Sequence, residues 1–317
     1  MSSTNATRFG FIGLGQMGLP MASNLARHLS DADHLNVFDI STASMQQISN
    51  EFPATVSICS SAKDIAEKAD VIFTMLPEGH HVKSVYLDGP NNILSADLSG
   101  KHLVECSTID TEASMRMKKE ALALYTTTHF YDAPVSGGVI GAVRGTLTFF
   151  VGCSHDDTNL PYLEQILHSM GKKVIPCGGF SLGLTSKICN NYLTGIMMLA
   201  SAETFNLGIR AGLDPKLLRN VIGAGTAKNM ICEAFCPVPN VVPGAPSSAG
   251  YKGGFRIPLM LKDLNLAMDL AQKVEAREDL GQVAQNVFDT ASKDDQYKDL
   301  DIASVFKMIG GNVKWDQ

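Results

Sequence analysis

The chain has 317 residues, a formal net charge of −6 and 18% charged residues, so it is long enough for two domains with cores of their own. This mild acidity, without any basic block, gives no electrostatic reason to expect nucleic acid as a partner. No apolar run approaches the ~20 residues that a membrane-spanning helix needs. The first seven residues, rich in Ser, Thr and Asn, do not resemble a secretory signal. We therefore expect neither a membrane nor nucleic acid among its partners.

The seven cysteines are scattered and odd in number. This argues against a disulfide framework and favours a reducing, intracellular compartment. Cys232 and Cys236 lie four residues apart, but no second His or Cys pair nearby completes a zinc pattern. We expect free thiols and no metal site.

The first half of the chain alternates short apolar segments with helical ones. Strands are predicted over 9–12, 35–38, 71–76, 103–106, 130–133, 147–151 and 174–176. Helices are predicted between most of them, including 17–29, 111–124 and 156–170. Such alternation predicts a largely parallel sheet with helices on both faces.

A G-x-G-x-x-G motif follows the first predicted strand directly and opens a helix. Gly13 permits a tight turn, Gly15 lets the backbone approach a pyrophosphate, and Gly18 lets the helix pack close to the strand. The helix N-terminus offers unpaired N–H groups and a positive dipole end to phosphates. We expect a dinucleotide to bind at the whole loop, Gly13, Leu14, Gly15, Gln16, Met17 and Gly18.

Asp39 ends the second predicted strand, about 20 residues after Gly18. An acidic side chain there accepts hydrogen bonds from the adenosine ribose of NAD. A 2′-phosphate would meet a like charge, and no Arg follows, so NAD is predicted rather than NADP. The alternative is that the glycines serve only a turn and that Asp39 only caps a helix near Ser41.

Other strand ends supply further candidates, because ligands of open parallel sheets bind beyond the carboxyl ends of the strands. Leu76, Pro77 and Thr108 are expected beside the cofactor. Ser107 and Thr108 could reach the nicotinamide ribose or the substrate, or instead cap the helix near Asp110.

Ser136, Gly137 and Gly138 follow the strand 130–133. A hydroxyl beside two backbone N–H groups without side-chain obstruction suits a substrate carboxylate. A simple glycine turn is the alternative.

After Gly179 the predicted secondary structure changes from alternating strands and helices to helices alone. A helix is predicted over 182–211, about 45 Å long at 1.5 Å per residue, ended by Gly212, Asp214 and Pro215. Helices are also predicted over 215–222, 259–274 and 279–292. We expect domains at 1–179 and 180–317, the second all-helical.

Two features of the second domain leave alternatives open. The Pro-, Gly- and Ser-rich segment 237–254 is either a solvated loop or an ordered cover over the active site. The apolar long helix could bury against a second copy of the chain, so a dimer or a tetramer is expected.

Lys187 and Asn191 lie one helical turn apart, so both side chains share one face of the long helix. A cation and an amide offered together suit a small carboxylate with a neighbouring hydroxyl or carbonyl. The alternative for Lys187 is a solvated lysine at a helix start. Lys262 either forms an exposed ion pair with Asp263 or reaches toward the cofactor.

Four motifs in this order resemble the β-hydroxyacid dehydrogenases: 13–18 with Met21 and Asn24, then 132–138, 183–191, and 262–264. The resemblance covers nearly the whole chain and implies an α/β Rossmann domain followed by an all-α C-terminal domain, joined by a long interdomain helix. It implies Lys187 as the catalytic residue, Ser136, Gly137 and Asn191 at the substrate, and Lys262 near cofactor or substrate. The stretch 139–144, with a bulky Ile140 and Arg144, departs from many members and leaves side-chain selectivity open.

The resemblance implies NAD-dependent, reversible oxidation of the primary alcohol of a short 3-hydroxy carboxylate to the semialdehyde, with Lys187 handling the proton. Alternatives are a reductase of tartronate or succinic semialdehyde, an imine reductase, or a non-catalytic dinucleotide-binding scaffold. Imine reductases lack the catalytic lysine, and a scaffold is expected to lose it, so Lys187 disfavours both. The resemblance places the protein in the mitochondrial matrix of a eukaryote, and otherwise in the cytoplasm.

Overall fold

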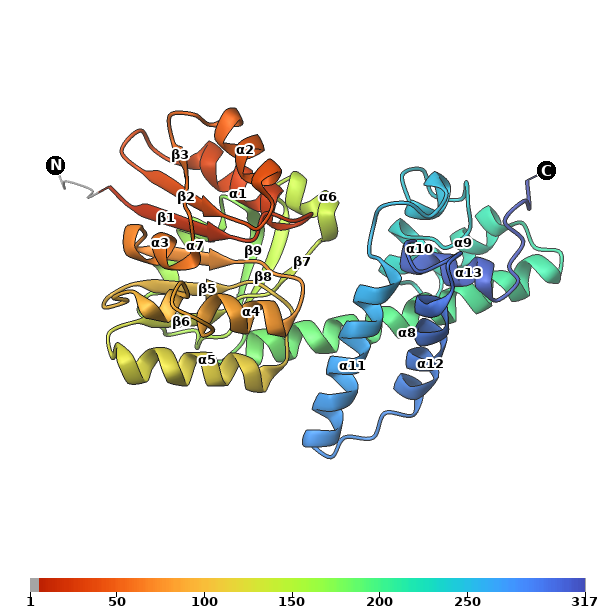
Figure 1. Cartoon of the computed structure of the whole chain (residues 1–317). Helices are drawn as coiled ribbons and strands as arrows, with labels where there is room; N and C mark the ends of the chain where they lie inside the picture. The colour runs from red at the N-terminus through yellow and green to blue at the C-terminus, as the bar shows by residue number, and fades with distance from the viewer. Residues whose placement is uncertain (1–5, 317) are drawn as a thin grey trace. The chain divides into compact units, whose positions relative to one another are not determined.

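The computed structural model describes residues 6–316 and divides into two compact units, with the boundary between Lys187 and Ile188. In the first unit, six parallel strands form a sheet in the order β3-β2-β1-β4-β5-β6 (Figure 1). The strands are β1 Arg8–Ile12, β2 His34–Phe38, β3 Val56–Ile58, β4 Val71–Thr74, β5 His102–Glu105 and β6 His129–Asp132. Residues 1–5, part of the segment judged not to be a secretory signal, lie outside the described residues.

Both faces of this sheet are buried. Phe11 belongs to the core that α1, α2 and α7 cover, and its neighbour Ile12 belongs to the core under α3, α4 and α5. The same alternation recurs on β4, β5 and β6, as the two-residue period of a strand requires. The predicted parallel sheet with helices on both faces is confirmed. The helices are α1 Gly18–His28, α2 Thr42–Glu51, α3 Ala62–Lys68, α4 Gly79–Tyr86, α5 Thr111–Leu124, α6 Gly138–Val143 and α7 Leu160–Leu167, with the short η1 Ile93–Ser95.

A second, three-stranded sheet was not predicted. It contains β7 Val135–Ser136, β8 Leu147–Val151 and β9 Gly171–Pro176, in the order β7-β8-β9. β8 runs antiparallel to β7 and parallel to β9. The segments 147–151 and 174–176 are strands as predicted, but they pair apart from the large sheet. An apolar run indicates a strand and does not indicate its neighbour, which depends on distant residues.

The long helix α8 covers Leu182–Arg210, close to the predicted 182–211, and the boundary between the units falls within it. Gly212 adopts φ 92° just past its end, and the Leu213 N–H donates to the Gly208 carbonyl over 2.9 Å. The Asp214 side chain then caps α9, Pro215–Ala224. The predicted stop is therefore confirmed.

The described part of the second unit contains helices and no named strand. Its core includes the fully buried Phe205, Phe288 and Phe306. After α9 come α10 Met230–Ala234, η2 Pro246–Ala249, α11 Ile257–Lys273, α12 Asp279–Lys293, η3 Ile302–Ser304 and α13 Val305–Met308. Within residues 6–316, no helix combines the length and apolar character that a membrane span requires.

The segment 237–254 packs into this second unit and is not a solvated loop. Val238 and Tyr251 are buried in its core. The Ser247 hydroxyl donates to the Cys236 carbonyl over 2.6 Å, and the Tyr251 hydroxyl donates to the Pro237 carbonyl over 3.0 Å. These bonds satisfy backbone acceptors that an irregular segment would otherwise leave to water.

Candidate active site

The glycine loop joins β1 to α1, and two of its glycines are required by close backbone contacts. Gly13 has φ 95°, and a Cβ there would lie 2.3 Å from the Met75 carbonyl oxygen. A Cβ on Gly18 would lie 1.9 Å from the Gly13 carbonyl oxygen. By contrast, no atom lies within 4 Å of a Cβ built on Gly15. Gly15 therefore borders open space in the described structure, as expected where a ligand approaches the backbone.

The start of α1 suits an anion. Its N-cap residue, Met17, makes no side-chain capping bond, and the first turn contains no acidic residue. The dipole of the helix start is therefore not offset by a local carboxylate, and the site fits a pyrophosphate. Leu14 is buried in the sheet core, so it can offer only its backbone to a cofactor, whereas Gln16 is exposed.

Asp39 connects the end of β2 to the glycine loop. Its Oδ2 accepts from the Leu14 N–H over 2.5 Å, and its Oδ1 accepts from the Ser41 N–H over 2.6 Å. The cap of α2 is Ser41, whose Oγ accepts from Ser44, so Asp39 is not the helix cap. A carboxylate can accept about four hydrogen bonds, which leaves roughly two for ribose hydroxyls.

Ile40, beside Asp39, was not singled out from the sequence. Its side chain is 96% exposed. An exposed apolar side chain next to the acidic end of β2 could pack against an adenine ring. The sequence pattern of an apolar residue directly after Asp39 could have indicated it.

A second candidate region, the ends of β4 and β5, is fixed by a buried carboxyl. The Leu76 N–H donates to Ser107 Oγ over 2.8 Å, and the Ser107 N–H donates to Glu105 Oε1 over 2.6 Å. Thr74 Oγ1 donates to the other oxygen, Glu105 Oε2, over 2.6 Å. Glu105 thus holds the loop that carries Leu76 and the exposed Pro77.

Ser107 is fully buried, so the expectation that it could reach a ligand is wrong. It also does not cap α5, because Asp110 accepts from the Ala113 N–H over 2.7 Å. Thr108, the next residue, is partly exposed. The position of Ser107 at a strand end suggested that its hydroxyl contacts a ligand. In the structure this hydroxyl accepts a hydrogen bond from the Leu76 N–H instead.

Burial raises the pKa of Glu105 to about 7, although the hydrogen bonds from Ser107 and Thr74 lower it. A carboxyl whose pKa is raised on folding contributes stability in full below its ordinary value of 4.5, and that contribution is lost as the pH rises through about 7. We expect Glu105→Gln to remove this loss. The wild type should lose on the order of 2 kcal/mol of unfolding free energy relative to the variant between pH 4.5 and pH 8.

Urea unfolding of both proteins at pH 5 and pH 8 measures this difference. The Gln side chain can still accept from Ser107 and donate to Thr74, so the network survives in the variant. Equal pH dependence in the two proteins would show that Glu105 is not the group that titrates.

The loop after β6 begins the expected substrate site. Ser136 lies on β7, is half-buried, and pairs with Thr148 of β8. Gly137 has φ 135° and is exposed, and a Cβ built on Gly138 would meet no atom within 4 Å. The loop therefore presents backbone to open space, as a carboxylate site needs.

Lys187 lies in the second turn of α8 and is half-buried. It belongs to the first unit, like the glycine loop and Ser136.

Asn191 and Lys262 belong to the second unit, where Asp263 holds both. The Asn191 Nδ2 donates to Asp263 Oδ2 over 2.5 Å, and Lys262 Nζ lies 3.1 Å from Asp263 Oδ1. Asp263 is 2% exposed, so the Lys262–Asp263 pair is not the exposed ion pair considered from the sequence. Asn191 is also buried, and its Oδ1 accepts from Asn190 over 3.0 Å.

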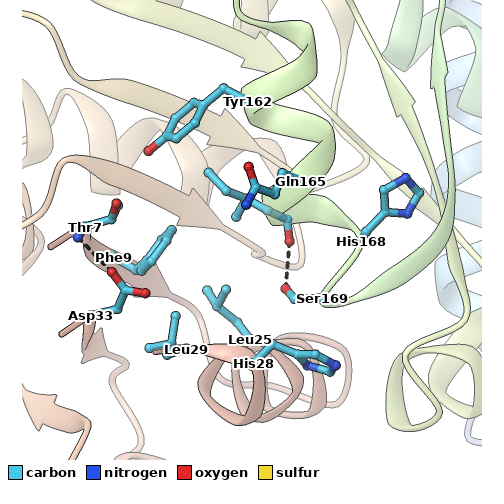
Figure 2. Close-up of a pocket in the computed structure, with 11 residues that line it drawn as sticks. Thr7, Phe9, Leu25, His28, Leu29, Asp33, Tyr162, Gln165, His168 and Ser169 are labelled. Carbon is cyan, nitrogen blue, oxygen red and sulfur yellow. Dashed lines mark hydrogen bonds between the residues drawn. The ribbon is translucent and has the colours of Figure 1, made fainter. Parts of the chain in front are cut away.

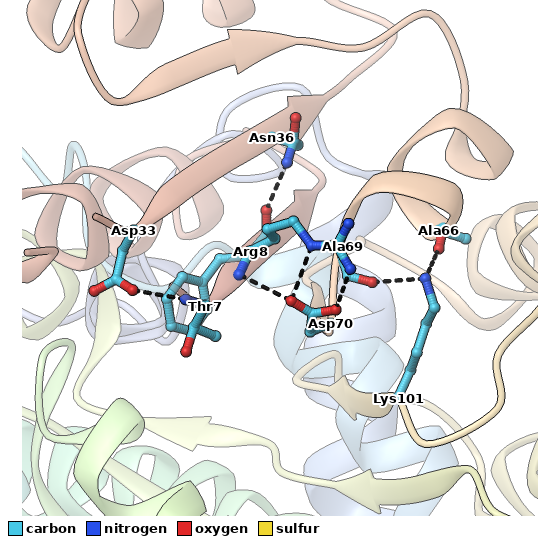
Figure 3. Close-up of polar contacts among 9 residues, drawn as sticks. Thr7, Arg8, Asp33, Asn36, Ala66, Ala69, Asp70 and Lys101 are labelled. Atoms are coloured by element: carbon cyan, nitrogen blue, oxygen red, sulfur yellow. Dashed lines mark hydrogen bonds and ion pairs between the residues drawn. The ribbon is translucent and has the colours of Figure 1, made fainter. Parts of the chain in front are cut away.

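A cavity of 390 Å³ lies between α1, α7 and the start of β1, and the residues that line it include Thr7, Asp33 and Ser169 (Figure 2). The nearby strand starts are joined by the exposed Arg8–Asp70 ion pair, and Lys101 Nζ donates to the Ala69 carbonyl over 2.8 Å (Figure 3). These are the amino ends of the strands. Ligands of such sheets bind at the carboxyl ends, so this cavity is not the cofactor site.

Comparison with known proteins extends over both parts of the chain. Residues 8–179 match the NAD binding domain of 6-phosphogluconate dehydrogenase, and residues 182–309 match the family described as NAD-binding of NADP-dependent 3-hydroxyisobutyrate dehydrogenase. The chain is 40% identical over 309 residues to mitochondrial 3-hydroxyisobutyrate dehydrogenase of Mus musculus, covering 97% of this chain and 88% of the relative. It is 36% identical over 302 residues to NAD-dependent L-serine dehydrogenase of Pseudomonas aeruginosa, covering 95% and 97%.

A solved structure of the 3-hydroxyisobutyrate dehydrogenase of Mycobacterium tuberculosis with L-serine is also similar. Its TM-score is 0.85 at 33% identity, covering 96% of this chain and 100% of that one. The fold, the glycine loop and these matches define an NAD-binding oxidoreductase that acts on CH–OH groups. Within that class, the chain belongs to the 3-hydroxyisobutyrate dehydrogenase family of β-hydroxyacid dehydrogenases. The resemblance expected from the four motifs is confirmed.

Proposed function

We propose that the protein catalyses the NAD-dependent, reversible oxidation of 3-hydroxyisobutyrate to its semialdehyde, a step of valine catabolism. The observation that carries the proposal is the 40% identity to mouse 3-hydroxyisobutyrate dehydrogenase over 97% of the chain. The segment 237–255 also resembles this branch of the family. The retained Lys187 supports catalysis rather than a scaffold role.

Most of the proposed cofactor-binding residues lie at the carboxyl ends of the strands. The glycine loop and the start of α1 would hold the pyrophosphate, and Asp39 the ribose, with Ile40 beside the adenine. Leu76, Pro77, Thr108 and Lys262 complete the proposed set. When bound, NAD supplies the carbon that accepts the hydride.

The chain's own part in the reaction is to hold the hydroxy acid and to move one proton. Ser136, Gly137 and Gly138 would bind the carboxylate, and Asn191 would bind the neighbouring oxygen. Lys187 Nζ would accept the hydroxyl proton during oxidation and return it during reduction. An ordinary lysine has a pKa of about 10.4, so a greater fraction of it is unprotonated and able to act as a base at alkaline pH.

A substrate panel tests the proposal. The kcat/KM values for 3-hydroxyisobutyrate, L-serine, glycerate and 4-hydroxybutyrate would be compared with NAD as the acceptor. We expect 3-hydroxyisobutyrate to be preferred. The similarity to L-serine dehydrogenase makes L-serine the second candidate, which differs by an ammonium group in place of a methyl. A preference for glycerate or 4-hydroxybutyrate would instead favour reduction of tartronate or succinic semialdehyde.

Asp39→Ala tests the cofactor choice. Losing the ribose acceptor should weaken NAD binding by about 10- to 100-fold, because one hydrogen bond to a charged group is worth about 1.5–3 kcal/mol. Removing the carboxylate should also narrow the difference in affinity between NAD and NADP, because the 2′-phosphate no longer meets a like charge. The Kd values of both cofactors for both proteins measure this. A wild type that already prefers NADP would contradict the role proposed for Asp39.

We also propose a homodimer or homotetramer in a reducing, intracellular compartment, which is the mitochondrial matrix in a eukaryote and otherwise the cytoplasm. Leu193 and Leu207 of α8 are 54% and 72% exposed, which supports burial of this helix against a second copy. Sedimentation velocity measures the oligomeric state. The seven scattered cysteines, an odd number, support the compartment.

A further inference from the structure

The first turn of α8 is held by a buried carboxylate from the large sheet. Asp132, the last residue of β6, is fully buried. Its Oδ1 accepts from the Ser181 N–H and its Oδ2 accepts from the Leu184 N–H, both over 2.8 Å. The first N–H groups of a helix have no partner within the helix, so Asp132 satisfies groups that α8 cannot satisfy itself. Lys187 follows Leu184 by three residues.

Close backbone contacts also fix the position of the first turn of α8. A Cβ on Gly183 would lie 2.4 Å from the Phe150 carbonyl oxygen and 2.8 Å from the Gly152 nitrogen. A Cβ on Gly152 would lie 1.9 Å from Asp132 Oδ1. The helix start, the end of β8 and the carboxylate therefore meet without intervening side chains.

A third contact fixes Phe180, two residues before the helix. The Phe180 ring meets the Phe130 ring edge-on, with centroids 5.8 Å apart. Lys118 Nζ, from α5, lies 3.9 Å from the centroid of the same ring. Ser181, between this anchor and the helix, has φ 68°, an uncommon conformation for a residue other than glycine. Contacts from β6, β8 and α5 together determine where α8 begins.

We propose that Asp132 is a positioning residue for the reaction, whose carboxylate fixes the first turn of α8 and so sets where Lys187 stands. This inference rests on the function proposed above, in which Lys187 handles the proton. A shift of about 1 Å in a reacting group can cost on the order of 10²-fold in rate, so the anchoring of one helical turn matters to turnover.

The presence of an aspartate at position 132, and not an asparagine, supports the positioning role. Burial raises the pKa of Asp132 to about 6, so holding this group ionised at neutral pH is costly. Asparagine would avoid that cost, but it has one acceptor oxygen, and its amide would face the second N–H donor. Only a carboxylate accepts both bonds.

Two variants and one matched control test the proposal. Asp132→Asn weakens the anchor, and Gly183→Ala keeps the carboxylate but forces the helix away from β8. Asp301 is the control, because it is also a buried carboxylate that accepts two backbone N–H groups, from Phe255 over 2.7 Å and from Ala303 over 2.9 Å. Asp301→Asn should therefore lower Tm in a comparable way.

We expect Asp132→Asn and Gly183→Ala each to lower kcat by about 10- to 100-fold, while the Kd of NAD stays within about twofold. Asp301→Asn should keep the wild-type kcat. A wild-type kcat in folded Asp132→Asn, or an equal loss of kcat in Asp301→Asn, overturns the proposal. If Asp132→Asn does not fold, Gly183→Ala decides by the same criterion.

A double substitution separates positioning from general structure. In a Lys187→Ala background, Asp132→Asn should cause no more than about a twofold further loss of residual turnover, because it acts through the lysine. A full additional loss contradicts the proposal. If Lys187→Ala itself retains wild-type turnover, the proton-handling role proposed for Lys187 fails instead, so the two failures are distinguishable.

Discussion

Lys187→Ala should lower kcat by about 10²- to 10⁴-fold, the usual contribution of a positioned acid–base group, and leave the Kd of NAD within about twofold. The physical reason is that the residue is assigned the hydroxyl proton, whereas the glycine loop and Asp39 are the residues proposed to hold the cofactor. Steady-state kinetics and a calorimetric titration with NAD measure the two quantities. In the wild type, oxidation should accelerate toward alkaline pH as more of the lysine is unprotonated.

Lys187→Arg is the matched control. Arginine keeps a positive charge for a substrate carboxylate, but it does not release its proton at any working pH. We expect turnover as low as in the alanine variant with a smaller rise in substrate KM. Recovery of turnover with arginine would mean that the residue acts only as a cation. Loss of NAD binding together with turnover would mean that it is structural.

Gly15→Ala and Gly18→Ala should both abolish tight NAD binding, by different routes. A Cβ at position 15 meets no protein atom within 4 Å, so the variant should keep its Tm and lose affinity only because the methyl enters the space expected for the pyrophosphate. A Cβ at position 18 would lie 1.9 Å from the Gly13 carbonyl oxygen, so the loop must move. That variant should lose both affinity, by about 100-fold or more, and on the order of 2 kcal/mol of stability.

Calorimetric unfolding and NAD titration of the two variants, side by side, check this contrast. Gly223→Ala in α9 provides a control away from the loop, because a Cβ there also meets no atom within 4 Å, and it should keep the wild-type Tm and NAD affinity. An unchanged NAD affinity in Gly15→Ala would show that the pyrophosphate does not approach this residue. An unchanged Tm in Gly18→Ala would show that the helix start can relax.

Local patterns were sufficient for much of the fold. The bounds of α5 and β8 agree with the prediction, because a side-chain cap and a short apolar run respectively define them. The stop after α8 was also readable, since Gly212, Asp214 and Pro215 each act within a few residues. Residues whose conformation depends on near neighbours are therefore the ones that the sequence predicts.

Distant contacts explain what was missed. The separate sheet β7-β8-β9 depends on pairing across many residues, and the short β3 has only three residues with one buried side chain. Ser107 was expected at a ligand because it follows a strand, but the Leu76 N–H uses its oxygen. The capping of α8 by Asp132 spans about fifty residues of sequence, and no motif spacing indicates it.

The segment from Asp132 to Ser136 has two tasks, because one end anchors α8 and the other opens the loop expected to hold the substrate carboxylate. Attempts to broaden the range of accepted hydroxy acids by mutating this segment should therefore damage turnover before they alter preference. The next helix is a safer target: Ile140 and Val143 of α6 are 51% and 58% exposed and carry no such anchoring bond through their side chains. Libraries aimed at those two positions can vary shape and polarity while the proton-transfer geometry stays intact.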